Sequence, residues 1–245
     1  MAKTAQAPAK NVPDLDVQRI LQLTGISVFF GWTPFILMRC FGAAGSLAST
    51  EFIGLIALAL ASAYLAADFF SGFVHWLADN YGSENWLLVG PGFIQPFREH
   101  HIHPKEIGEH DFIRLNGNTC LTALLALWWA TLPTYTPANA GSVVFFGIFW
   151  TGVAWLTMGT NQFHRWAHTE PDHKLIQWLQ QNYVILNTKH HDKHHQAPHT
   201  KAYCITTGHM DHPLRWLAFF PILEWTIETL FRLPPHHKRS QEAAQ

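Results

Sequence analysis

Hydrophobic residues gather in long uncharged runs, and these runs predict membrane-spanning helices. Residues 115–164 contain no Asp, Glu, Lys or Arg, whereas one bilayer span needs only about 20 residues. The segment 132–141 inside this run holds two prolines and a glycine, which indicate a turn. The run is therefore predicted to form two helices, at about 117–135 and 142–163.

Two earlier runs predict two further spans. Residues 20–38 are uncharged, and residues 52–67 are uncharged in a run that continues past Asp68. We place these spans at about 20–42 and 51–77, so that the expected fold is an all-α membrane protein with four transmembrane helices. A soluble four-helix bundle is the alternative, but its helices would show a polar stripe that these runs lack.

The ends of the chain differ from the runs between them. Residues 1–18 are polar and rich in Ala and Pro and are expected to be a disordered tail, and 234–245 are expected to be another, with solvated His236 and His237. The N-terminal tail is not expected to be a signal peptide, because the hydrophobic run begins late and is too long. Residues 213–233 have an apolar stripe and four charged residues, which is typical of a helix lying in the membrane interface. The stripe consists of Trp216, Phe220, Leu223, Ile227 and Leu230.

Positive charges give the expected orientation. The first loop has only Arg39 and the 132–141 turn has no Lys or Arg, while the termini and the 79–115 loop carry nearly all the others. By the positive-inside rule, the termini and this long loop are predicted to be cytoplasmic. The membrane is expected to be a bacterial inner membrane or the endoplasmic reticulum.

The most informative feature of the composition is its high histidine content. The chain has 17 His against 16 Lys and Arg together, and its net charge of −1 excludes a nucleic-acid binder that acts through bulk positive charge. The three cysteines are far apart in sequence, which excludes a disulfide scaffold and a cysteine-based zinc module. The sequence therefore carries more imidazole than packing requires.

The histidines all fall at the predicted cytoplasmic side. They lie at the end of the second span, in the loop after it, at the end of the fourth span and just beyond. Spacings of three and four residues place several on one helical face, and neutral imidazole is the commonest metal ligand. The candidate metal ligands are His75, His100, His101, His164, His168, His191, His194 and His195.

Eight imidazoles exceed the usual four to six positions of one first-row ion, so they predict two ions. Nitrogen-rich sites suit Zn, Cu, Fe or Ni. Zinc hydrolases usually use three protein ligands and zinc is redox-inert, so the excess of imidazole at a membrane surface favours iron and oxidative chemistry. The His-rich segments then form a cytoplasmic helical cap beneath the spans.

Four motifs resemble one family. They are DFFSGFVHWLADNYG at 68–82, FREHHIHPKEIGEHDFIRLNGN at 97–118, NQFHRWAH at 161–168 and KHHDKHHQAPHTKAYCITTG at 189–208. They look like the plasmanylethanolamine desaturase family, the Kua-type lipid desaturases, with plant plastid lipid desaturases as more distant relatives. The resemblance covers about residues 50–232, and the lipid desaturase domain is expected over 19–233.

The resemblance also implies roles for particular residues. His75 matches an HWxxD motif with Asp79 as its acidic partner, and His110 and His199 match motifs that accompany the ligands. Asp79, His110 and His199 are therefore the candidate catalytic residues. Residues expected to orient the imidazoles are Asp79, Asp111, Asn161 and His190, the last of which is also an alternative to His191 as a ligand. His103 and His209 depart from the family pattern, which bears on substrate detail.

The family's activity gives the expected function. A di-iron centre with dioxygen as co-substrate would remove two hydrogens from the 1-O-alkyl chain of plasmanylethanolamine and leave the vinyl ether of a plasmalogen. The expected partners are the bilayer, an ether phospholipid, and an external electron donor such as a b-type cytochrome or a ferredoxin, because GxGxxG and CxxCH are absent. The cations Arg98, Lys105, Arg114 and Lys201 are candidates for the lipid phosphate.

Three alternatives stay open. A di-iron acyl desaturase or lipid hydroxylase would use the same cofactor and differ in product. A histidine-rich metal transporter would place its ligands near the bilayer centre, unlike this pattern. A scaffold that uses zinc for structure would hold zinc and no iron.

Overall fold

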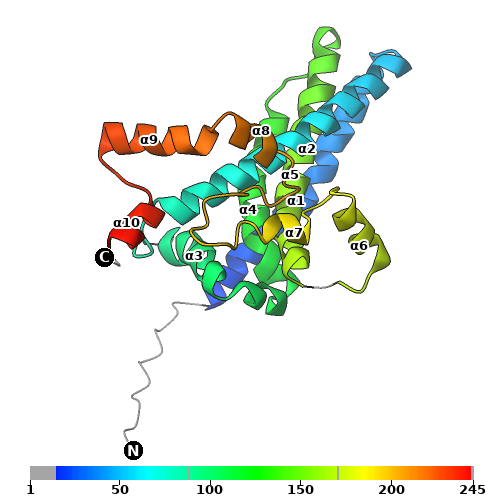
Figure 1. Ribbon diagram of the computed structural model, residues 1–245. Coiled ribbons are helices and arrows are strands. Elements are labelled where there is room, and N and C mark those ends of the chain that lie inside the picture. Colours follow the sequence, from blue (N-terminus) through cyan, green and yellow to red (C-terminus); the bar gives the residue numbers. More distant parts are fainter. Residues whose placement is uncertain (1–14, 88, 170, 244–245) are drawn as a thin grey trace, which may run out of the picture.

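The computed structural model describes residues 15–87, 89–169 and 171–243, and this part of the chain is helical with no strand. Four long helices form a bundle: α1 (Leu15–Ala44), α2 (Ser49–Asn80), α4 (Phe112–Thr131) and α5 (Ala140–His168). Helix α4 packs against α1 and α5, and α2 packs against α5 (Figure 1). The predicted all-α class is confirmed for the described residues.

Three helices in the described residues are long and apolar enough to cross a membrane. They are Val17–Ala44, Ser49–Asn80 and Pro137–His168, and they indicate a membrane protein. The predicted span at 117–135 corresponds to α4, which is 20 residues long and begins with the more polar segment 112–118. Because of this polar start, α4 is less apolar than the three candidate membrane-spanning helices.

The bundle has a core of small and aromatic side chains, and close helix contact requires glycine at two places. A Cβ on Gly147 would lie against the sulfur of Cys40 in α1, and a Cβ on Gly152 would lie 2.8 Å from the Cβ of Ala63 in α2. Small residues at helix crossings are what membrane helices use to approach each other. Large apolar side chains face outward instead, among them Met38, Ile53 and Leu125 at 65%, 65% and 61% exposure.

Short helices cover the end of the bundle where α2 and α5 finish. They are η1 (Gly90–Ile94), α3 (Gln95–Ile102), η2 (Pro104–Glu109), α6 (Lys174–Gln181) and α7 (Thr188–His191). Helix α3 contacts α2, and η2 and α7 contact α5. The His-rich segments that sequence analysis assigned to a cap therefore lie against the ends of two long helices (Figure 1).

The predicted C-terminal interfacial helix is divided. Helices α8 (Asp211–Trp216) and α9 (Phe219–Phe231) are separated at Ala218, whose φ of 49° is left-handed. Of the predicted apolar stripe, Phe220, Leu223 and Ile227 pack with Trp76 of α2 rather than facing outward. The opposite face is apolar too, with Trp225 67% exposed and Phe231 71% exposed, because α9 is apolar nearly all round.

The tails differ from the sequence-based expectation where the structure describes them. The expected N-terminal tail, residues 1–18, lies outside the described residues except for its last four, which already belong to α1. The expected disordered tail at 234–245 contains a helix, α10 (His236–Ala243). His237 Nδ1 in that helix lies 2.8 Å from Asn80 Oδ1 at the end of α2, so His237 is not merely solvated.

Candidate metal centre

Histidines from four helices (α2, α3, α5 and α7) and from the loop after α7 meet where the bundle meets its cap. We name two sets by their members. Set A contains His100, His164, His168, His191 and His195, and set B contains His75, Asp79, His101 and His194. Within each set the possible ligand atoms all lie within 4.8 Å of one another. All eight predicted ligands are therefore brought together from distant segments of the chain.

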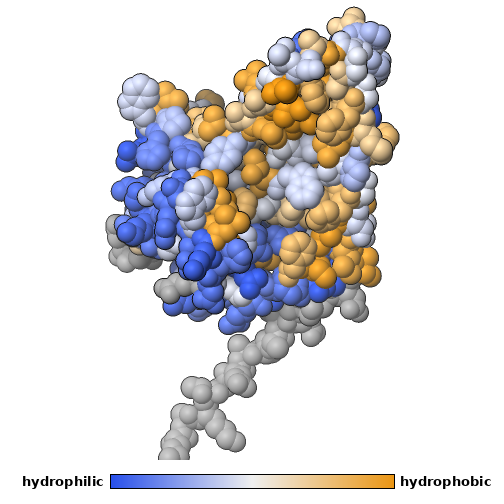
Figure 2. All heavy atoms as spheres, turned by 90° about the vertical axis from the view of Figure 1, so that its right-hand side faces the viewer, coloured by the Kyte–Doolittle hydropathy of each residue, from blue (hydrophilic) through white to orange (hydrophobic). Residues whose placement is uncertain are grey.

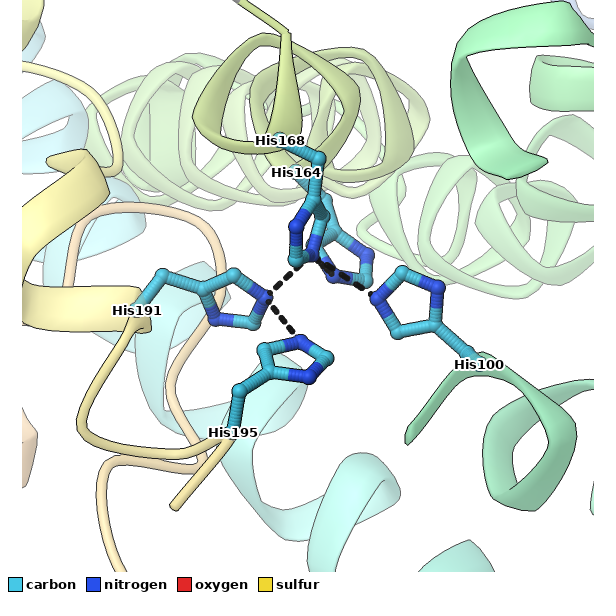
Figure 3. Close-up of side chains that lie close together, drawn as sticks. All are labelled: His100, His164, His168, His191 and His195. Atoms are coloured by element: carbon cyan, nitrogen blue, oxygen red, sulfur yellow. Dashed lines mark hydrogen bonds between the residues drawn. The ribbon is translucent and has the colours of Figure 1, made fainter. Parts of the chain in front are cut away.

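In set A the ring nitrogens point at a common centre (Figure 3). His168 Nε2 lies 2.9 Å from His100 Nε2, 3.2 Å from His164 Nε2 and 2.8 Å from His191 Nε2. His195 Nε2 lies 3.0 Å from His191 Nε2. One ring nitrogen carries at most one hydrogen, so hydrogen bonds cannot satisfy three such contacts at His168.

A metal ion between the rings would satisfy these contacts. Two nitrogens bound at about 2.1 Å from one ion and at right angles to each other are about 3 Å apart, which is the spacing in set A. The Nε2 atoms of set A are too close together for the few N–H groups available, and a cation between them would account for this spacing.

Set B adds a carboxylate. His101 Nε2 lies 2.8 Å from His194 Nε2, and Asp79 Oδ2 lies 3.5 Å from both His75 Nε2 and His194 Nε2. His75 Nε2 and both Asp79 oxygens are buried and form no hydrogen bond with any described group. Unpartnered buried polar atoms are costly, and a cation shared by these atoms would remove that cost.

Backbone carbonyls fix two of the set B rings. His75 Nδ1 donates to the Tyr203 carbonyl at 3.0 Å, and His194 Nδ1 donates to the Lys201 carbonyl at 2.9 Å. With the proton on Nδ1, each ring presents its Nε2 lone pair to the set, as in other metal sites where a ligand histidine is oriented by its second nitrogen.

Burial keeps the cap imidazoles neutral. Desolvation first, and then the neighbouring imidazoles, lower the pKa of His100 and of His101 to about 2. Desolvation likewise lowers the pKa of His194 to about 3, and together with His199 it lowers the pKa of His195 to about 4. Metal binding requires neutral imidazole, so at neutral pH these rings are ready to bind.

Ligands that are neighbours in sequence belong to different sets. His100 of set A precedes His101 of set B in α3. His194 of set B lies between His191 and His195 of set A. The sets also adjoin in space, because the ring centroids of His101 and His195 are 5.6 Å apart.

The residues expected to orient the imidazoles do not lie behind the ligand rings. Asp79 is among the possible ligands of set B rather than behind them. Asp111 is exposed, accepts the amides of the first turn of α4 and pairs with Arg19 at 2.9 Å. Asn161 donates to the Leu115 carbonyl at 2.8 Å. The structure therefore does not support an orienting role for Asp111 or Asn161.

His190 does not take the place of His191. Its Nε2 lies 2.7 Å from Asp211 Oδ2, on the side where Gly208 packs against its ring. His191 is in set A. The geometry therefore groups His191, and not His190, with the possible ligands of set A.

Besides Asp79, the predicted catalytic residues are His199 and His110, and both lie beside the sets. The His199 ring stacks on the His101 ring at 4.3 Å with an interplanar angle of 2°, and its Nδ1 donates to the His194 carbonyl. His110 is half-buried and its Nε2 has no hydrogen-bond partner among the described groups. His103 is exposed, and the His209 ring lies 5.9 Å from that of Tyr64.

Sequence reasoning missed the anchor formed by Asp68. Its carboxylate accepts the amides of Thr207 at 2.7 Å, Gly208 at 3.0 Å and Met210 at 2.8 Å. Asp68 therefore holds the segment after Tyr203, whose carbonyl orients His75.

Comparisons with known proteins agree with this geometry. The model of the lipid desaturase domain matches residues 64–238. The chain belongs to the lipid desaturase family. Both ligand sets lie within the matched region, and the resemblance seen in the motifs is confirmed.

Individual relatives of this family member come from distant organisms. A plasmanylethanolamine desaturase of Myxococcus xanthus is 39% identical over 211 residues, which are 84% of this chain and 70% of that protein. Plasmanylethanolamine desaturase 1 of Mus musculus is 42% identical over 189 residues, 75% of this chain and 69% of that protein. Fatty acid desaturase 4, chloroplastic, of Arabidopsis thaliana is 32% identical over 170 residues, 69% of this chain and 50% of that protein. No solved structure matches the chain.

Proposed function

We propose that this family member is a membrane desaturase that converts the 1-O-alkyl chain of plasmanylethanolamine to the vinyl ether of a plasmalogen. The observation that carries the proposal is the pair of adjoining ligand sets, five imidazoles in one and three imidazoles with a carboxylate in the other. The relatives named plasmanylethanolamine desaturase support this substrate over an acyl chain, because they cover more of the chain at higher identity than the plant fatty acid desaturases.

Two iron ions would be held by sets A and B. Bound iron would supply the oxidising power, with dioxygen, for removing hydrogen from an unactivated alkyl carbon. Imidazole-rich sets fit iron by ligand type, and a purely structural zinc site needs only four ligands in total. Set A, with five donors, exceeds that need.

The chain's own residues hold and shield this chemistry. Tyr203 and Lys201 orient His75 and His194 through their carbonyls, and all members of set B except His101 are buried. Asp79 serves as a ligand of set B, while His199 supports His101 by stacking. His110, half-buried near His100, is proposed to act on protons at the edge of set A.

The proposed topology has four spans with the sets on the cytoplasmic side. Helix α4 supports a fourth span because Leu125, Trp128 and Trp129 are 61%, 47% and 45% exposed, as lipid-facing residues would be. Lys and Arg at the cap end support the sidedness. The ligands lie at the ends of α2 and α5, which does not favour a transporter with its site at mid-membrane. An external b-type cytochrome or ferredoxin would supply the electrons.

The experiment that tests the function uses the purified full chain. We expect about two iron ions per chain, and formation of acid-labile vinyl ether when the reduced protein meets 1-O-alkyl-glycerophosphoethanolamine and dioxygen. An acyl-unsaturated or hydroxylated product would replace this proposal with one of the two alternatives. Zinc in place of iron, without any product, would refute it.

A further inference from the structure

An open cavity adjoins set A; most of its lining residues are polar, and no member of set B is among them. Its volume is about 1050 Å³, and it lies between η2, the end of α5, α6 and α7. His168 and His195, both ligand candidates of set A, form part of its wall. Any molecule in this cavity therefore reaches the edge of the metal centre.

The cavity carries both signs of charge. Lys105 of η2, Lys189 of α7 and Asp192 line it and are exposed. Among the ion pairs of the described residues, none involves these three side chains. Two ammonium groups with one carboxylate complement a molecule that carries a phosphate and an ammonium group, because charged groups form the stronger hydrogen bonds.

The position of the reacting bond requires a headgroup site close to the ligands. In a 1-O-alkyl phospholipid, the first alkyl carbon is separated from the phosphorus by about six bonds, or about 8 Å at most with ordinary bond lengths. A lipid that presents this carbon to the metal centre must place its phosphate beside it. The cavity bordered by His168 and His195 has that position.

The surroundings of the cavity suit the surface of a membrane. Leu175 and Trp178 of α6 are 56% and 55% exposed, and Tyr183 and Val184 just after it are 46% and 38% exposed. Aromatic and apolar residues beside polar groups are typical of the membrane interface. On the face shown in Figure 2, hydrophilic atoms gather at the lower left and adjoin a largely hydrophobic surface above and to the right.

We propose that this cavity binds the phosphoethanolamine headgroup of the lipid, with Lys105 and Lys189 on the phosphate and Asp192 on the ammonium group. The inference rests on the proposed function and adds the site of headgroup recognition. Of the four cations that sequence analysis named as candidates for the lipid phosphate, the proposal retains Lys105. Arg98 is engaged with Glu84 and with the carbonyls of Tyr81 and Gly82, and Lys201 lines a separate small pocket.

The first test removes the phosphate contacts. We compare the double variant Lys105→Gln, Lys189→Gln with the matched control Lys193→Gln, which is exposed and does not line the cavity. With 1-O-alkyl-glycerophosphoethanolamine in detergent, we expect KM to rise at least about tenfold in the double variant, as loss of charged hydrogen bonds implies, and to stay within about twofold in the control. Equal KM values in both variants would overturn the inference.

The second test addresses the ammonium group. Asp192→Asn should lower the preference for an ethanolamine over a choline headgroup, because only the ethanolamine ammonium donates hydrogen bonds to a carboxylate. An unchanged preference would show that Asp192 does not contribute to headgroup selectivity.

The third test measures binding without turnover and separates two sources of phosphate. Soluble glycerophosphoethanolamine should compete with a spin-labelled ether lipid for the metal-free wild type, and inorganic phosphate at the same concentration should not. Equal competition by phosphate would indicate a general anion site and overturn headgroup recognition. The metal-free double variant should bind the labelled lipid at least about tenfold more weakly.

An acidic electron-carrier protein is the competing occupant. If the lysine variants raised KM for the carrier and left KM for the lipid unchanged, the cavity would be a docking surface for that protein and the headgroup inference would fail. If wild type formed no vinyl ether at all, the proposed function would fail instead. A wild type that makes vinyl ether, with variants like the control, would refute the headgroup site alone.

Discussion

Replacement of Asp68 by asparagine tests how the chain holds the segment behind set B. Asp68 is fully buried, and its Oδ1 accepts the amides of Thr207 and Gly208 while Oδ2 accepts the amide of Met210. In the Asp68→Asn variant the remaining side-chain oxygen can stay at the Oδ1 position and keep two of the three bonds. The new amide group then faces the Met210 N–H, so that two donors meet without an acceptor.

The magnitude follows from these contacts. Loss of one hydrogen bond to a charged group costs about 1.5–3 kcal/mol, and the two bonds that remain weaken by about 1 kcal/mol each when the acceptor becomes neutral. We expect Asp68→Asn to lower the free energy of unfolding by about 3.5–5 kcal/mol. For a chain of this length that corresponds to a fall in Tm of roughly 7–20 °C.

The assay is thermal unfolding of the metal-free protein in detergent, followed by tryptophan fluorescence. The matched control is Asp111→Asn, since Asp111 also accepts backbone amides, of Ile113 and Arg114, but is exposed to solvent. Water replaces its lost bonds, so the control should unfold close to wild type. If Asp68→Asn lowered Tm no more than Asp111→Asn did, the anchoring role of Asp68 would be wrong.

Three further predictions concern the metal centre and the bundle. His168→Ala and His101→Ala should each lower bound iron from about two ions toward one, measured by elemental analysis, with His103→Ala as an unaffected control; a full complement of iron in either would contradict the sets. In the metal-free protein the folded cap imidazoles have pKa values below the ordinary value of about 6.5, so the unfolded chain binds more protons at acid pH. Tm should therefore fall as pH decreases from about 6.5 toward 4, the pKa of His195 being about 4, and a Tm independent of pH over this range would contradict burial of neutral rings. Gly147→Leu should reduce the yield of folded protein, measured by size-exclusion chromatography, because its side chain would occupy the space of Cys40.

The long helices could be predicted because uncharged runs dominate their sequence. Each predicted span falls within or near a long helix, but α2 and α5 continue past the predicted ends, to Asn80 and His168. Those extensions carry members of sets A and B, and hydropathy does not register polar residues that continue an apolar helix. The break at Ala218 could not be predicted, since it depends on how α9 packs on Trp76.

That the histidines of sets A and B lie together could be predicted from their spacing, whereas the groups that orient their rings could not. Backbone carbonyls of Tyr203 and Lys201 orient two rings, and any residue type supplies a carbonyl. Asp111 follows the HH motif closely in sequence, but its oxygens are occupied by first-turn amides and Arg19. Asp79 stands four residues after His75 on one helix face, a spacing that fits a shared ion as well as an orienting contact.

The alternation of ligands along α3 and after α7 has a consequence for assembly of the enzyme. When the first ion immobilises His100, or His191 and His195, it also stiffens the short backbone links to His101 and His194. The entropy of those links has then already been lost, so the second ion should bind more tightly than the first. Titration of the metal-free protein should pass from empty to doubly filled with little half-filled protein between.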